Sequence, residues 1–354
     1  MSTILVTGAA GLVGSEVVAR LVKSGHKVLA LVHRQQVLHR NSGAALCSAD
    51  VTLVPGDVTK PRLGLPARIA STVDKVVHCA AITDFGRSKA VYQSVNVDGT
   101  TNVVELAAGL GVPLVHVGTA YVCGERDGVA LESDLDVGQR FANAYEESKL
   151  QAETLVHKAR ADGLAAAVVR PSIVVGAERT GVVRDFKNLY VVLKLTTEGK
   201  VRSIPGHYDA NLDLVPVDYV ADLTVEVAER FSEAEGKTFH AVGKALTLRD
   251  FSDVLAEYPS FGVPRFVPPS SFDAQRLPMA ERMYYERVAS LYESYFQRRV
   301  HFDTSTTDAF RRRKAPSGGP AYLRRLLDHC LKVGYLGAPL PSVTEVLSGL
   351  DGGS

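Results

Sequence analysis

The feature that most constrains the fold is a group of glycines between a short apolar segment and an amphipathic helix near the start of the chain. Gly8, Gly11 and Gly14 follow the β-type segment Ile4–Thr7, and segment 15–24 has apolar residues spaced as on one helix face. Such a turn lets the backbone approach a pyrophosphate, which then lies on the amides of the helix N-terminus. Glycines also occur in ordinary turns, but this strand–turn–helix context predicts a dinucleotide-binding site.

The first half of the chain alternates apolar strands with helical patterns. Further strands are expected at 27–32, 51–54, 75–78, 114–117 and 166–169, and helices near 89–110 and 143–162. Apolar strands joined by helices indicate a parallel sheet covered on both faces, with its ligand site at the carboxyl ends of the strands. The predicted fold class is therefore α/β, a doubly wound parallel sheet of the Rossmann type.

The pattern changes after residue 176. Segment 212–217 is expected to be a returning strand, followed by a helix from residue 218 to about 231 and a strand over 238–242; from about residue 265 the chain is mainly helical. We expect a nucleotide-binding domain formed by residues 1–176 and 212–245. A smaller, mainly helical substrate-binding domain is expected from 177–211 and 246–354.

Composition excludes several classes of function. The net charge of the 354 residues is +1, which gives no electrostatic argument for a nucleic acid or membrane partner. The four cysteines, Cys47, Cys79, Cys123 and Cys330, form no CxxC pair, so neither a metal site nor a redox dithiol is expected. The N-terminus lacks a basic segment before its apolar run, and no apolar stretch is long enough to span a bilayer. We therefore expect a cytoplasmic protein.

The residues after the second strand bear on the choice of cofactor. An acidic residue there would accept a hydrogen bond from the ribose 2′-hydroxyl of NAD. This chain has His33 and Arg34 instead, and a cation suits a 2′-phosphate. The sequence therefore favours NADP(H), although a solvated basic turn would have the same composition.

A tyrosine and a lysine four residues apart are the central catalytic candidates. Tyr145 and Lys149 lie in a predicted helix, where this spacing places both on one face. A free phenol has a pKa near 10, and a neighbouring ammonium would lower it. Tyr145 could then exchange a proton with a carbonyl oxygen, while Lys149 holds the nicotinamide ribose.

The GxxGxxG spacing resembles the extended branch of the short-chain dehydrogenase/reductase superfamily. The resemblance implies that Thr119, at the end of the fifth strand, completes a catalytic set with Tyr145 and Lys149. It also implies that Asn96 bonds backbone near the site. The cofactor-binding residues that it implies, with those inferred above, are Gly8, Gly11, Leu12, Val13, Gly14, His33, Arg34, Asp57, Val58, Cys79, Ala80, Ala81, Lys149, Pro171 and Ile173.

A narrower resemblance is to thioester reductases and fatty acyl-CoA reductases of the male-sterility type. Segments 55–65, 78–85, 118–121, 201–206, 212–219 and 301–306 are similar to those families. The resemblance implies NADPH-dependent reduction of a thioester on coenzyme A or a carrier protein, to an aldehyde or on to an alcohol. Because the sequence begins at the first strand, we expect any carrier to act in trans. Segment Arg311–Lys314 could meet a coenzyme A phosphate or an acidic carrier protein, or it could equally be a solvated basic helix end.

Two other functions stay open from the sequence. The first is an NADP(H)-dependent ketone or aldehyde reductase acting on a secondary metabolite. The second is a regulator that senses NADP(H) without turnover, which the complete set Thr119, Tyr145 and Lys149 disfavours. The apolar stretch 189–195 fits an acyl channel, core packing or the surface of a homodimer equally well.

Overall fold

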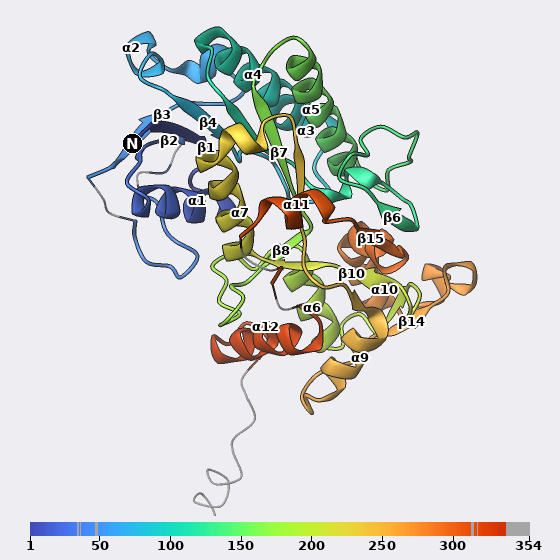
Figure 1. Cartoon of the computed structure of the whole chain (residues 1–354). Coiled ribbons are helices and arrows are strands. Elements are labelled where there is room, and N and C mark those ends of the chain that lie inside the picture. Colours follow the sequence, from blue (N-terminus) through green and yellow to red (C-terminus); the bar gives the residue numbers. More distant parts are fainter. Residues whose placement is uncertain (34, 36, 47–48, 313–314, 317, 338–354) are drawn as a thin grey trace, which may run out of the picture.

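A seven-stranded parallel sheet forms the centre of the molecule (Figure 1). The computed structural model describes residues 1–33, 35, 37–46, 49–312, 315–316 and 318–337. Every pairing between neighbouring strands of this sheet is parallel. In spatial order the strands are β12 (Thr238–Ala241), β7 (Ala166–Pro171), β5 (Leu114–Val117), β4 (Lys75–His78), β1 (Thr3–Thr7), β2 (Lys27–Val32) and β3 (Val51–Pro55).

Both faces of the sheet are buried, because alternate residues of each strand pack into different cores. Ile4 and Val6 of β1 face the core made with α1 (Leu12–Lys23) and α7 (Val217–Glu229). Leu5, between them, faces the core made with α4 (Gly99–Leu110) and α5 (Ala144–Ala161). Figure 1 shows these helix pairs on opposite sides of the strands. The expected doubly wound α/β fold is confirmed.

The expected returning strand 212–217 is not part of this sheet. It is divided at Asp213 into β10 (Asn211–Leu212), antiparallel to β13 (Leu246–Thr247), and β11 (Leu214–Pro216), parallel to β8 (Ile173–Val175). The carboxylate of Asp213 accepts hydrogen bonds from Ser172 Oγ and Gly243 N. These bonds hold Asp213 between the two short ladders. Segment 211–216 therefore does not join the main sheet, and the edge strand next to β7 is β12.

A third core lies where the chain leaves the carboxyl ends of the strands. It joins α6 (Leu189–Thr197), α9 (Leu248–Ala256), α12 (Pro320–Lys332) and the 3-10 helix η6 (Ala289–Phe296) to Tyr121, after β5. Figure 1 shows α6, α9 and α12 together below the sheet. Two short parallel pairs flank them, β14 (Arg265–Val267) with β9 (Ser203–Pro205) and β15 (Val300–Phe302) with β6 (Gly128–Ala130).

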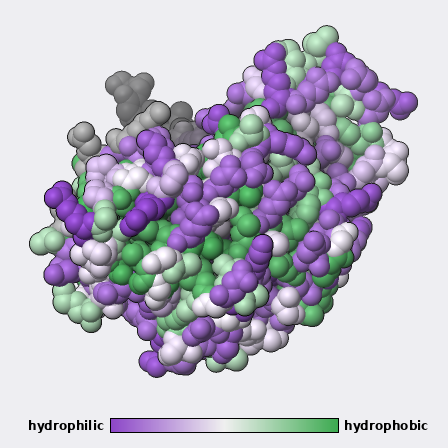
Figure 2. All heavy atoms as spheres, turned by 90° about the horizontal axis from the view of Figure 1, so that it is seen from above, coloured by the Kyte–Doolittle hydropathy of each residue, from purple (hydrophilic) through white to green (hydrophobic). Residues whose placement is uncertain are grey.

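The remaining elements are short. They are η1 (Pro61–Gly64), α2 (Ala67–Ala70), α3 (Lys89–Tyr92), the π-helical turn η2 (Gln93–Asp98), η3 (Ala120–Cys123), α8 (Phe231–Ala234), η4 (Pro269–Ser271), η5 (Ala274–Arg276), α10 (Met279–Arg287) and α11 (Ser305–Phe310). Figure 2 shows hydrophilic side chains over much of the face seen from above, with hydrophobic side chains exposed between them. Across the described ranges, no helix combines the length and apolar character that a membrane crossing requires.

Candidate active site

The glycine turn between β1 and α1 is built so that its backbone can close tightly. Gly8 has φ +64°, and a Cβ there would lie 2.6 Å from Ala80 N. A Cβ on Gly14 would lie 2.1 Å from Gly8 O. Gly11 caps α1 without a side-chain hydrogen bond, and the first turn of α1 contains no acidic residue. The positive end of the helix therefore remains available to an anion such as a pyrophosphate.

His33 follows the carboxyl end of β2 and lies at the surface. The His33 side chain is 62% exposed, and its Nε2 lies 3.7 Å from Asp57 Oδ2. Hydrogen bonds from the backbone and side chain of Thr59 hold the pKa of Asp57 below its usual value, and His33 adds to this effect. Asp57 therefore orders its own turn after β3. Arg34, predicted to read a 2′-phosphate, lies outside the described residues.

Thr119 and Tyr145 bring two hydroxyl groups together at the carboxyl end of β5. Thr119 Oγ1 donates a hydrogen bond to Pro171 O at 3.2 Å and accepts one from Tyr121 N at 3.3 Å. Tyr145 lies in the first turn of α5, which Asn143 caps by accepting a hydrogen bond from Glu146 N at 3.0 Å. Burial raises the pKa of Tyr145, and a side-chain hydrogen bond with Thr119 opposes that effect. The phenol is therefore protonated at neutral pH.

Lys149 lies one turn farther along α5 and is buried. Its Nζ donates a hydrogen bond to Val117 O at 3.1 Å. Burial lowers the pKa of Lys149 to about 8, while the nearby carboxylate of Glu153 acts in the opposite direction. The expectation that Lys149 lowers the pKa of Tyr145 is wrong for this structure, because burial dominates the tyrosine and the ammonium is directed to the end of β5.

Asn96 links the loop after β4 to α5, the helix that carries Tyr145 and Lys149. It lies in the π-helical turn η2, a kind of irregularity often found at functional sites. Its side chain accepts a hydrogen bond from Ile82 N at 2.8 Å and donates to Ser148 Oγ at 3.0 Å. Ser148 Oγ in turn donates to Tyr145 O at 2.7 Å. Asn96 thus bonds backbone near the site, as expected.

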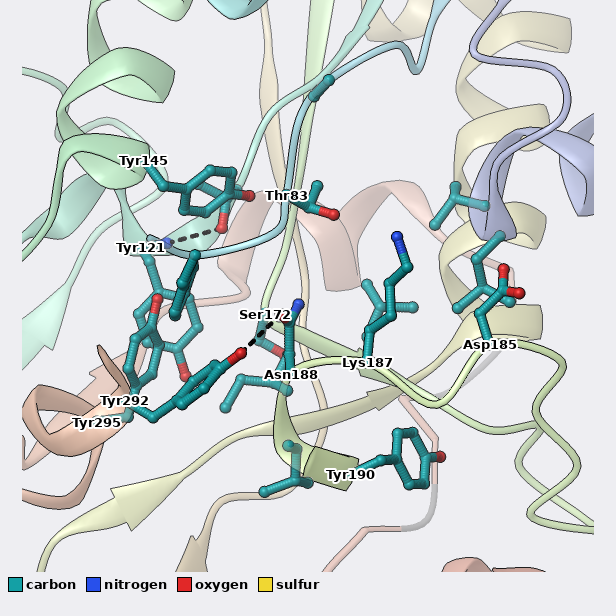
Figure 3. A pocket seen from close by; sticks show the side chains of 18 of the residues that line it. Thr83, Tyr121, Tyr145, Ser172, Asp185, Lys187, Asn188, Tyr190, Tyr292 and Tyr295 are labelled. Atoms are coloured by element: carbon teal, nitrogen blue, oxygen red, sulfur yellow. Dashed lines mark hydrogen bonds between the residues drawn. The ribbon is translucent and has the colours of Figure 1, made fainter. Parts of the chain in front are cut away.

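A cavity of about 330 Å3 joins the glycine turn to the two hydroxyls (Figure 3). The predicted residues that line it are Gly8, Gly11, Leu12, Val13, Gly14, Cys79, Ala81, Thr119, Tyr145 and Ile173. The predicted residues that do not line it are His33, Asp57, Val58, Ala80, Lys149 and Pro171. Of these, Pro171 accepts a hydrogen bond from the lining residue Thr119, and Lys149 bonds Val117 O, two residues before Thr119. In the described part of the chain, no group of three His, Cys, Asp or Glu residues is placed to hold a metal ion.

Several lining residues were not predicted from the sequence. Segment 185–192 contributes Asp185, Lys187, Asn188, Leu189, Tyr190 and Val192, and other elements contribute Thr83, Phe85, Tyr121, Ser172, Val174, Leu212, Tyr292, Tyr295 and Phe296. For α6 the available signal was the apolar stretch 189–195. It did not single out a cavity wall, because core packing and a channel predict the same apolar pattern. In the structure Leu189, Tyr190 and Val192 line the cavity, while Leu193 and Leu195 are buried in the third core.

The basic segment 311–314 is only partly described. The guanidinium of Arg311 lies 4.1 Å from the centroid of the Tyr219 ring, and its Nε lies 3.6 Å from Glu226 Oε2. Its side chain is 3% exposed. Arg311 is therefore a packing residue and does not face a solvent-borne partner. Arg313 and Lys314 lie outside the described residues.

Comparison with known proteins identifies the family. The sequence model of the family described as "Male sterility protein", an NAD-binding family, matches residues 6–224. The chain is 26% identical over 298 residues to an isonitrile lipopeptide synthase of Streptomyces coeruleorubidus, covering 78% of this chain and 19% of that protein. It is 23% identical over 344 residues to fatty acyl-CoA reductase 1 of Arabidopsis thaliana, covering 72% and 70% of the two chains.

Solved structures share the fold over nearly the whole chain. The terminal R domain of the myxalamid PKS-NRPS biosynthetic pathway superposes with a TM-score of 0.80 at 24% identity, covering 96% of this chain and 93% of that one. UDP-glucuronic acid 4-epimerase of Bacillus cereus superposes with a TM-score of 0.69 at 20% identity, covering 95% and 99%. With the family match over more than half of its length, the chain belongs to the male sterility family of NAD(P)-binding oxidoreductases, within the extended short-chain dehydrogenases/reductases.

Proposed function

We propose that the protein uses NADPH to reduce an acyl thioester, carried on coenzyme A or a carrier protein, to an aldehyde and a free thiol. The observation that carries this proposal is the meeting of Thr119 and Tyr145 at the wall of a cavity that starts at the glycine turn. The names of the relatives, a lipopeptide synthase and a fatty acyl-CoA reductase, agree with a thioester substrate.

The residues present fit a dinucleotide. The glycine turn and the first turn of α1 would hold the pyrophosphate, and the small residues after β4 (Cys79, Ala80 and Ala81) would leave space for the adjoining ribose. His33 and Arg34, with no acidic residue at that position, would favour a 2′-phosphate and hence NADP(H). The reduced nicotinamide, when bound, supplies the hydride.

The chain's own hydroxyls would act on the substrate oxygen. As the carbonyl carbon becomes tetrahedral, negative charge develops on its oxygen, and Tyr145 and Thr119 would donate hydrogen bonds to it. A phenol whose pKa is raised is a protonated donor at neutral pH, which suits reduction. Lys149, with a pKa of about 8, is mostly charged at pH 7 and would orient the nicotinamide ribose.

Collapse of the tetrahedral species completes a two-electron reaction. The carbon–sulfur bond breaks, the oxygen returns to a carbonyl, and the sulfur leaves and takes up a proton. Hydride has then replaced the thiolate on the acyl carbon.

We further propose that residues 177–211 and 246–354 act as the substrate-binding domain, since α6 and η6 supply much of the cavity wall.

The test is a coupled measurement of NADPH oxidation and thiol release. Acyl-CoA and acyl-pantetheine thioesters are offered, with the matching aldehydes and ketones in parallel. Oxidation with one free thiol per NADPH supports thioester reduction. Oxidation with ketones alone would make the protein a ketone reductase, and NADPH binding without turnover of any substrate would support the regulator.

A further inference from the structure

The cavity has an aromatic side, formed by elements far apart in the sequence. We call Phe85, Tyr121, Tyr145, Tyr292 and Tyr295 the aromatic wall; all five line the cavity. The centroid of the Phe85 ring lies 5.5 Å from that of Tyr145, 5.0 Å from that of Tyr292 and 5.7 Å from that of Tyr295. Tyr121 and Tyr295 meet edge to face at 4.7 Å. The rings are therefore one continuous surface that includes the catalytic tyrosine.

A buried ion pair fixes the aromatic wall from behind. The guanidinium of Arg298 lies 4.8 Å from the Tyr295 ring centroid and 5.6 Å from that of Tyr121. Arg298 Nη2 donates to Glu146 Oε1 at 2.9 Å, and the two side chains are 4% and 0% exposed. Glu146 is the neighbour of Tyr145 and also bonds Tyr295. Two rings of the wall, Tyr121 and Tyr295, are thus tied to the helix that carries Tyr145.

Charge in the cavity lies away from the aromatic wall. Figure 3 shows Asp185 and Lys187 on the side opposite Tyr145, Tyr292 and Tyr295. The cavity is also lined by the aliphatic side chains of Ile173, Leu189, Val192 and Leu212. An acyl group whose carbonyl meets Tyr145 would therefore extend along aromatic and aliphatic carbon.

From this arrangement we infer that the acyl group is compact and aromatic, with its ring close to the thioester carbon. The inference rests on the proposed function, of which it names the substrate class. A planar ring can stack offset or edge-on against Phe85 and Tyr292, and such ring pairs favour binding beyond the area that they bury. A long flexible chain would lose more conformational freedom against a rigid wall and could not form these contacts.

Two thioesters of equal carbon number test the inference. Benzoyl-pantetheine and cyclohexanecarbonyl-pantetheine differ in the planarity and π system of the ring, and kcat/KM is measured for each with NADPH. Wild type is expected to favour the benzoyl thioester by about threefold to tenfold. Phe85→Leu should reduce this ratio to about one, and Tyr292→Leu provides a second variant in case the first does not fold.

A matched control removes a ring outside the cavity. Tyr284 is 40% exposed and does not line the cavity, so Tyr284→Leu should leave the ratio unchanged. Equal kcat/KM for the two thioesters in wild type would overturn the inference. A preference that survives both Phe85→Leu and Tyr292→Leu would also overturn it.

Binding of unreactive analogues separates this inference from the proposed function. The probes are S-benzyl-pantetheine and S-(cyclohexylmethyl)-pantetheine, titrated by calorimetry into the protein with NADP+ present. Tighter binding of the benzyl thioether without reduction of any thioester would overturn the proposed function and keep the aromatic subsite. Thioester reduction with equal binding of the two thioethers would keep the function and overturn the subsite.

Discussion

Removing the hydroxyl of Tyr145 separates catalysis from folding. The ring should stay packed in Tyr145→Phe, because its packing is against other rings. The ring centroids of Phe85 and Tyr92 lie 5.5 Å and 6.3 Å from that of Tyr145. The hydroxyl lost has Thr119 as its side-chain partner. Loss of one such hydrogen bond should change the free energy of unfolding by about 1 kcal/mol or less.

The effect on turnover should be much larger. Removing one donor to a developing oxyanion lowers kcat by about 100- to 1,000-fold, which corresponds to about 3 to 4 kcal/mol. Thr119 remains as a second donor, so residual activity is expected. NADPH affinity should change less than about twofold, because the hydroxyl acts on the substrate oxygen and the glycine turn is untouched.

The assay measures kcat from NADPH absorbance at saturating thioester and Kd from the fluorescence of bound NADPH, which no tryptophan disturbs in this sequence. Tyr92→Phe is the matched control. It removes a phenol hydroxyl that donates to Asp84 O at 2.7 Å, and kcat should stay within about twofold of wild type. A fall in kcat of less than tenfold for Tyr145→Phe, or an equal loss of NADPH affinity, would refute the assignment.

Three further predictions concern charge. Burial lowers the pKa of Lys149 to about 8, so its ammonium is lost as pH rises through that value. Above pH 8, kcat/KM for NADPH should therefore fall about tenfold per pH unit. A flat profile from pH 7 to 10 would contradict the role of Lys149. Arg34→Ala should weaken NADPH binding by about tenfold or more while leaving NADH binding nearly unchanged, since only NADPH carries the 2′-phosphate; equal weakening in a titration of both would reject the assignment. Burial raises the pKa of Asp213 from 3.8 to about 6. Its contribution to stability is therefore complete below the unfolded pKa and is lost as pH rises through 6. Between pH 5 and 8 the wild type should lose about 1 to 2 kcal/mol relative to Asp213→Asn in denaturant unfolding, and parallel curves would show that Asp213 does not titrate as proposed.

The sheet was predictable because its signals are local. Each strand of a parallel sheet is buried on both faces and reads as a short apolar run, as in Lys27–Val32 and Leu114–Val117. The glycine turn and the spacing of Tyr145 and Lys149 are also local, since each depends on residues within one turn or helix. Segment 212–217 was misjudged because the bonds that divide it at Asp213 come from Ser172 and Gly243, which its own sequence does not reveal.

Much of the candidate site depends on contacts between distant residues. Tyr292 and Tyr295 lie far from Tyr145 in the sequence. Tertiary packing alone brings η6 to α5, where Tyr295 bonds Glu146. The direction of the Tyr145 pKa shift likewise follows from burial, which residue spacing does not reveal. Besides Tyr145, the parts of the aromatic wall whose position at the carboxyl edge could have been inferred are Phe85, a few residues after β4, and Tyr121, soon after β5.

The central claim is tested most directly by following the hydride. The protein is incubated with a thioester and NADPH carrying deuterium at both C4 positions, and the aldehyde product is trapped as a hydrazone for mass spectrometry. The account predicts one deuterium on the former thioester carbon, with one thiol released for each NADPH oxidised. Release of thiol with formation of an unlabelled carboxylic acid would show hydrolysis instead and would contradict the account.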